Sequence, residues 1–174
     1  MRRRDLIAGV GSVAALGAGA VVATQGVPSV GGSDAERVRS ITVDRIDAPG
    51  SEAGSVELPA SNRPTFIDFF ATWCEPCEAQ MPALAATNDR IGGDVRFVSV
   101  TTEGIPEAEI VEWWAEHDGD WSLAHDPTTE LTAEYSPPGI PYAVAVDAAG
   151  RIRWSEPGRK TADELVAGIE RAME

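Results

Sequence analysis

The chain has 174 residues, which suits one ordinary domain with short appendages, and its 43% hydrophobic residues exclude a disordered polymer. Its 28 acidic and 14 basic residues give a net charge of −14, which argues against nucleic acid and anionic lipid as partners because it repels phosphate. The acidity is either an ordinary soluble surface or an adaptation to concentrated salt, where screening removes self-repulsion. Lys160 is the only lysine, and this scarcity favours the second interpretation, with a halophilic archaeon as the source.

The N-terminal segment, residues 1–24, has the pattern of an export signal, with charged residues 2–5 (RRRD) before an apolar run. Residues 3–7 (RRDLI) resemble a twin-arginine signal. The segment is either cleaved or retained as an N-terminal anchor. Residues 25–37 read as a linker, which leaves residues 38–174 as the folded domain. We therefore expect an extracytoplasmic protein, secreted or anchored to the outer face of the cytoplasmic membrane.

The first half of the domain predicts three strands and a helix. Alternating apolar residues over 41–46 and 56–58, separated by a turn-rich stretch, predict a β-hairpin. Residues 65–71 (TFIDFFA) predict a buried central strand with one polar residue, Asp68. A helix then begins at Cys74, is kinked at Pro82 and ends at residues 92–93 (GG).

The second half alternates strands with helices. We predict a buried strand over residues 95–100, an acidic amphipathic helix from Pro106, a short helical turn over 128–135, strands over 142–146 and 151–154, and a last helix from Thr161 or Asp163. Buried strands that alternate with helices before a final hairpin predict an α/β fold, in which helices flank both faces of a central mixed β-sheet.

The chain has two cysteines, in the sequence Cys74-Glu75-Pro76-Cys77. A disulfide that closes so short a loop constrains the unfolded chain very little, so a structural staple is a poor explanation. Unpaired N–H groups at a helix N-terminus stabilise a thiolate and lower a cysteine pKa from ~8.5 towards ~7 or below. Cys74 is then the attacking sulfur, and Cys77 resolves the mixed disulfide.

Three other interpretations of the cysteine pair compete with a redox role. A zinc site needs four ligands, and only His117 and His125 could complete it, at an unsuitable spacing. A copper-carrying thiol pair with His125 as third ligand remains an alternative, because soft thiolates select Cu(I). An inert local disulfide is the third. For the redox pair we expect no metal and no cofactor.

Several motifs in order resemble the TlpA/ResA-like exported thioredoxins of the thioredoxin superfamily. They are residues 69–77 (FFATWCEPC), the pair Met81-Pro82 and residues 139–141 (GIP) before a strand. The resemblance covers roughly residues 38–174 and implies a thioredoxin fold with an N-terminal β-hairpin extension. It also implies that the Ile140–Pro141 peptide is cis and faces the cysteines, where its backbone would pair with a substrate strand.

Two residues depart from the pattern of ResA-like proteins. Gln80 stands where these proteins commonly have a glutamate, and Asp68 stands where they commonly have an asparagine. Asp68 instead matches thioredoxin proper, in which a buried aspartate moves protons for the resolving cysteine. We hypothesise that burial raises the pKa of Asp68 and that Asp68 deprotonates Cys77. The alternative is a partly solvated aspartate without a role.

The residues around the cysteines are expected to tune them. Negative charge at Glu75 and Glu78 should push the potential towards the reducing side. Trp73 packs either over the disulfide or in the core, and Pro76 and Ile140 complete the tuning set. Trp113, Trp114 and Tyr135 are interpreted as core or interface residues, while His117 and His125 are assigned no role.

The predicted function is an exported thiol–disulfide oxidoreductase that acts as a reductant on thiol or disulfide proteins. The resemblance implies apocytochrome c or a copper-site protein as client, and a membrane thiol-electron transporter as electron source. The alternatives are an oxidant that introduces disulfides and a copper-binding thiol chaperone.

Overall fold

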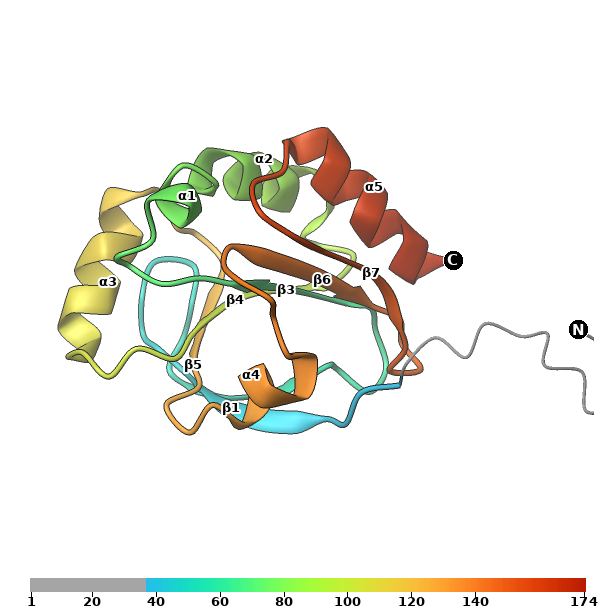
Figure 1. The fold of residues 1–174 in the computed structure, drawn as a ribbon, viewed down its shortest axis with the longest axis horizontal. Coiled ribbons are helices and arrows are strands. Elements are labelled where there is room, and N and C mark those ends of the chain that lie inside the picture. The colour runs from blue at the N-terminus through green and yellow to red at the C-terminus, as the bar shows by residue number, and fades with distance from the viewer. Residues whose placement is uncertain (1–36) are drawn as a thin grey trace, which may run out of the picture. The chain divides into compact units, whose positions relative to one another are not determined.

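A computed structural model describes residues 37–174 as seven strands in one mixed sheet with five helices (Figure 1). The strands are β1 (Ile41–Arg45), β2 (Gly54–Leu58), β3 (Thr65–Phe69), β4 (Arg96–Thr101), β5 (Ser122–His125), β6 (Tyr142–Val146) and β7 (Ile152–Pro157). The helices are α1 (Glu75–Glu78), α2 (Met81–Ile91), α3 (Glu107–Glu116), α4 (Glu130–Tyr135) and α5 (Ala162–Met173). The export signal and most of the linker predicted for residues 1–37 lie outside the described residues.

The centre of the sheet is formed by the most apolar strands. The strand order is β2-β1-β5-β4-β3-β6-β7, with β3 parallel to β4 and antiparallel to β6. Every residue of β3 and β6 is buried, as expected for strands covered on both faces. This confirms the predicted α/β architecture with a mixed sheet.

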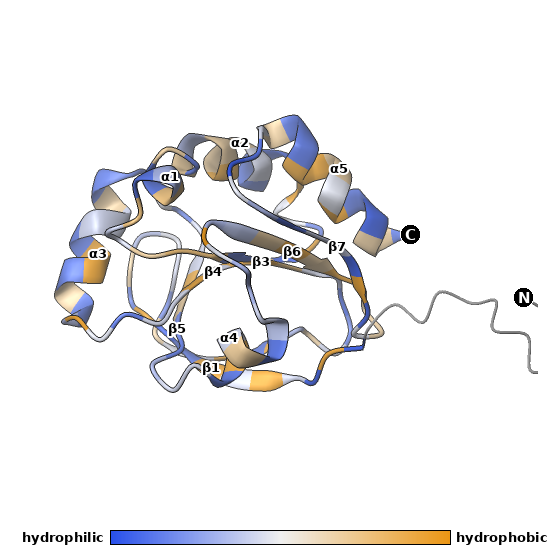
Figure 2. Cartoon of the chain, viewed as in Figure 1, coloured by the Kyte–Doolittle hydropathy of each residue, from blue (hydrophilic) through white to orange (hydrophobic). Residues whose placement is uncertain are grey.

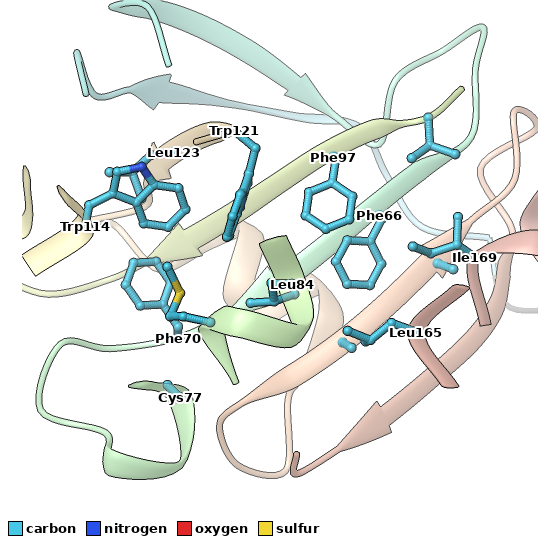
Figure 3. Packing of buried hydrophobic residues seen from close by; sticks show 14 of the residues in the cluster. Phe66, Phe70, Cys77, Leu84, Phe97, Trp114, Trp121, Leu123, Leu165 and Ile169 are labelled. Carbon is cyan, nitrogen blue, oxygen red and sulfur yellow. The ribbon is translucent and has the colours of Figure 1, made fainter. Parts of the chain in front are cut away.

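Successive residues of β3 point to opposite faces of the sheet and enter two separate cores. Phe66 and Phe70 belong to the core under α2, α3 and α5, where Figure 3 shows them together with Cys77. Cys74 belongs to the same core. Ile67 and Phe69 belong to the core on the opposite face, where α4 packs against β1 (Figure 1). Asp68, between them, lies on the face of the cysteines.

The helices bury one side and expose the other, which is why hydrophilic and hydrophobic residues alternate along α3 and α5 in Figure 2. In α5 the buried residues are Leu165, Gly168, Ile169 and Ala172. The helix begins with a capping box, in which the Thr161 and Glu164 side chains each bind the other's backbone N–H. Among residues 37–174, no helix combines the length and the apolar character needed to span a membrane.

The N-terminal hairpin is confirmed, and it extends the sheet beyond β5. β1 pairs antiparallel with β2, with Ile41 opposite Leu58. Just before β1, the Val38 N–H donates to the Gly150 carbonyl at 2.9 Å, in the turn between β6 and β7. The residues just before β1 therefore lie against the turn between β6 and β7, and Val38 belongs to the core that contains Ile67 and Phe69.

Two elements differ from the sequence predictions. β5 was not predicted as a strand, yet it joins β1 to β4 within the sheet. The single kinked helix expected after Cys74 was wrong, because α1 ends at Glu78 and α2 begins at Met81. Pro82 explains the break: proline lacks an N–H and clashes with the carbonyl four residues earlier, so it sits in the first turn of a new helix.

Candidate active site

Cys74 and Cys77 form a disulfide at the start of α1, so the structure represents the oxidised protein. Cys74 is the N-cap residue, in an extended conformation with φ −93° and ψ 96°. The Cys77 N–H points at the Cys74 sulfur with an N···Sγ distance of 3.2 Å. This N–H is placed to stabilise a negative charge on Cys74 once the disulfide is reduced.

The two sulfur-bearing residues differ little in exposure, since Cys74 is 4% and Cys77 1% exposed. Cys74 lies at the end of the loop that leaves β3, whereas Cys77 lies inside the single turn of α1. The two cysteines therefore differ in their position relative to α1 and not in their exposure.

Asp68 lies in the middle of β3 and is 2% exposed. Burial raises its pKa from 3.8 to about 7, although a hydrogen bond from Ser99 acts in the opposite direction. The Ser99 hydroxyl donates to Asp68 Oδ2 at 3.4 Å and accepts a hydrogen bond from Trp121 Nε1 at 3.0 Å. A carboxyl group with a pKa near neutrality is suited to exchange protons at physiological pH.

The Ile140–Pro141 peptide is cis, as the resemblance implied. The next residue, Tyr142, pairs with Phe69 at the end of β3, so this loop and the segment leading to Cys74 emerge from neighbouring strands. Pro141 has no N–H, and its carbonyl accepts a hydrogen bond from the Gly158 N–H at 2.8 Å. The Pro141 carbonyl is therefore already bonded within the protein.

Trp73 is 75% exposed, so its interpretation as a core aromatic was wrong. Together with Phe70 and Ile140 it lines a small hollow of about 80 Å³ that also contains Glu103 and Pro137. An exposed tryptophan beside a redox-active cysteine is available for contact with another protein.

The other aromatic residues belong to the core, as predicted. Trp114 is fully buried and Tyr135 is 5% exposed. Trp113 is partly buried and stacks on Phe70, with ring centres 5.3 Å apart. Trp113 and Trp114 therefore pack in the core that contains the cysteines, whereas Tyr135 packs in the core on the opposite face of the sheet.

Both polar atoms of the Gln80 side chain are hydrogen-bonded to the backbone of another segment. Gln80 is 3% exposed, and its amide binds the backbone of Lys160 twice, with Nε2 donating to the carbonyl at 3.0 Å and Oε1 accepting from the N–H at 2.7 Å. These two hydrogen bonds connect the residues between α1 and α2 to the loop before α5. Glu75, Pro76 and Glu78 are exposed at the same end of the molecule.

The two histidines bind protein groups in different places. His117 Nδ1 lies 2.7 Å from the Trp113 carbonyl, and His125 Nε2 lies 2.8 Å from the Glu103 carbonyl. Within residues 37–174, no three His, Cys, Asp or Glu side chains are grouped so that they could hold a metal ion.

Sequence reasoning missed two residues that the fold brings to the site. Ser99 contacts Asp68, and Glu103 binds the loop before Cys74. A serine inside the apolar run VRFVSV was a usable signal, because a buried hydroxyl needs a partner. Glu103 follows the strand in a polar stretch and gave no such signal.

Residues 35–172 match the model of the Redoxin family. The chain belongs to the Redoxin family. Thiol-disulfide oxidoreductase ResA of Bacillus cereus is 24% identical over 69% of this chain and 70% of that protein. Thiol:disulfide interchange protein HelX of Rhodobacter capsulatus is also 24% identical, over 72% of this chain and 70% of its own length.

Other matches are more local or concern the fold alone. Chloroplastic thioredoxin Y of Oryza sativa is 37% identical, but this chain spans only 27% of its length. The crystal structure of StoA from Bacillus subtilis has a TM-score of 0.64 at 22% identity and covers 74% of this chain and 95% of StoA. These findings confirm the resemblance to TlpA/ResA-like proteins, the thioredoxin-like fold and the predicted class of thiol–disulfide oxidoreductase.

Proposed function

We propose that this protein is an exported thiol–disulfide oxidoreductase that reduces disulfides in other proteins, with Cys74 as nucleophile and Cys77 as resolving thiol. The observation that carries the proposal is a disulfide at the N-terminus of α1, on the same face of the sheet as a buried carboxyl group with a raised pKa. No cofactor is needed, because the two sulfurs carry both electrons.

The proposed cycle begins with the reduced protein. The Cys74 thiolate attacks one sulfur of a substrate disulfide, which forms a mixed disulfide and releases the other substrate sulfur as a thiolate. Asp68 takes the proton from the Cys77 thiol, and the resulting Cys77 thiolate attacks Cys74. The substrate leaves with two reduced sulfurs, and this protein is left with the Cys74–Cys77 disulfide.

The surface around the disulfide supports a protein as substrate. The Ile140 backbone would pair with the extended segment that carries the substrate cysteine, while Pro141, without an N–H, ends the ladder there. Trp73 is exposed beside it and offers an apolar surface to the client. Pro76 fills the first turn of α1.

The reducing direction rests on charge. Glu75 and Glu78 are exposed within α1, and negative charge near the sulfurs disfavours the thiolate and hence the reduced form. The resemblance to ResA-like proteins supplies the client class, apocytochrome c or a copper-site protein, and a membrane thiol-electron transporter as electron source. The twin-arginine pattern supports export, with residues 25–37 as linker to the domain over residues 38–174 and with cleavage or anchoring of residues 1–24 left open.

The proposal is tested by insulin reduction and by the reduction potential. The reduced protein should reduce insulin disulfides, Cys74→Ser should abolish this, and Cys77→Ser should accumulate the mixed disulfide. The potential should lie near ~−270 mV, as for thioredoxin-like reductants, whereas a value near ~−120 mV would show an oxidant. An active Cys74→Ser variant would rule out the mechanism. Retention of stoichiometric Cu(I) without insulin reduction would favour the copper chaperone.

A further inference from the structure

Glu103 binds the segment that leads into the nucleophilic cysteine. Its Oε2 accepts a hydrogen bond from the Thr72 N–H at 2.7 Å, and its Oε1 accepts one from the Thr72 hydroxyl at 2.7 Å. Thr72 is two residues before Cys74, in a turn that is closed by the Cys74 N–H donating to the Ala71 carbonyl at 3.1 Å. One carboxylate therefore holds both the backbone and the side chain of this turn.

The turn has few other attachments to the sheet. The Phe70 N–H donates to the Val100 carbonyl at 3.1 Å, just beyond the end of β3, and the chain then leaves the strand. Thr72 lies past that point, so its N–H has no place in the ladder between β3 and β4. Hydrogen bonds to a carboxylate are roughly twice as strong as those between neutral groups, so Glu103 replaces the ladder with a stronger attachment.

Glu103 is itself held by two strands. The Thr101 hydroxyl, at the end of β4, donates to Glu103 Oε2 at 3.0 Å. The Glu103 carbonyl lies 2.8 Å from His125 Nε2, at the end of β5. Glu103 thus joins the turn before Cys74 to the ends of two strands of the sheet, which is the arrangement that a positioned catalytic group requires.

We propose that Glu103 is a positioning residue for the disulfide exchange, which holds the Thr72–Cys74 turn when the disulfide is open. In the oxidised protein the bond to Cys77 also fixes Cys74. In the reduced protein that covalent tie is gone, and the hydrogen bonds from Thr72 to Glu103 keep the turn, with Trp73 and the nucleophile, in place relative to the Ile140 backbone. The role of Glu103 therefore concerns attack on a docked protein disulfide and not the intrinsic reactivity of the thiolate.

Three variants separate this role from a charge effect. Glu103→Gln removes the charge, but its carboxamide can still accept from the Thr72 N–H and donate to the Thr72 hydroxyl oxygen. Glu103→Ala removes both the charge and the bonds, and Thr72→Val removes only the hydroxyl bond. Glu112→Gln, in the exposed middle of α3, is the control for loss of one negative charge.

Two rates are measured on the reduced variants at a pH above the thiol pKa, one with insulin and one with iodoacetamide, a small reagent that needs no docking. Glu103→Ala should lower the insulin rate about tenfold and leave the iodoacetamide rate unchanged. Glu103→Gln and Glu112→Gln should stay within about twofold of the original protein, and Thr72→Val should fall between.

The proposal is overturned if Glu103→Ala reduces insulin as fast as the original protein, or if both rates fall in parallel. It is also overturned if Glu103→Gln is as slow as Glu103→Ala, because charge would then be the cause. If Glu103→Ala does not fold, the insulin rate of Thr72→Val is the test. An unchanged rate in that variant contradicts a positioning role for Glu103.

Discussion

Replacing Asp68 with asparagine should make the oxidised protein more stable at alkaline pH and change its stability little in acid. Burial raises the pKa of Asp68 from 3.8 to about 7, so between these values the native state holds a proton that the unfolded state has lost. Stability therefore falls as the pH rises through this window and is unaffected by Asp68 below it. At 1.36 kcal/mol per pKa unit, the full loss is about 4 kcal/mol above pH 7. Asparagine does not ionise and escapes this loss.

The assay is urea unfolding of both oxidised proteins between pH 4.5 and pH 8. Asp68→Asn should exceed the original protein in free energy of unfolding by about 1 kcal/mol at pH 4.5 and by about 4 kcal/mol at pH 8. Asp94→Asn, at an exposed position, is the control and should show no such trend. A stability difference that stays constant with pH would mean that Asp68 ionises like an ordinary aspartate, and the argument for its role as proton acceptor would fail.

Two further predictions concern Gln80 and the surface charge. Gln80→Ala should lower the free energy of unfolding by about 2 kcal/mol, because two buried hydrogen bonds to the Lys160 backbone are lost. Gln80→Glu should be less stable than the original protein only at pH values at which the glutamate is ionised, because its carboxylate then faces the Lys160 carbonyl. Urea titrations at several pH values check both variants. Potassium chloride should raise the urea midpoint, since it screens the repulsion within a chain of net charge −14. An equal rise with an uncharged osmolyte would contradict the electrostatic explanation.

The sequence predicted those elements of the fold whose pattern is local. The runs that became β3 and β6 are apolar on both faces, and the hairpin of β1 and β2 shows alternation around a turn. β5 was missed because its four residues contain only two adjacent apolar side chains, Leu123 and Ala124. Its strand conformation comes from pairing with β1 and β4 on either side, which no local pattern carries.

The same division separates the parts of the site. The cysteines and the Ile140–Pro141 loop were identified because each is a contiguous motif. The partners of Thr72 and Gln80 were not, because Glu103 is 31 residues from Thr72 and Lys160 is 80 residues from Gln80. Gln80 was noted only as a departure from a family pattern, and its hydrogen bonds explain how a glutamine is accommodated there.

The structure also changes the explanation of why Cys74 should be reactive. α1 has only four residues, so few aligned peptide units stand behind Cys74, and the dipole of a long helix is absent. What remains is the contact of the Cys77 N–H with the Cys74 sulfur at 3.2 Å, in a position that is 4% exposed. Glu75 and Glu78 oppose the thiolate, but their exposed charges are screened by water and salt, whereas the buried N–H is not. The donor and the two carboxylates therefore act on the thiolate in opposite directions, and a rise in salt concentration weakens only the contribution of the carboxylates.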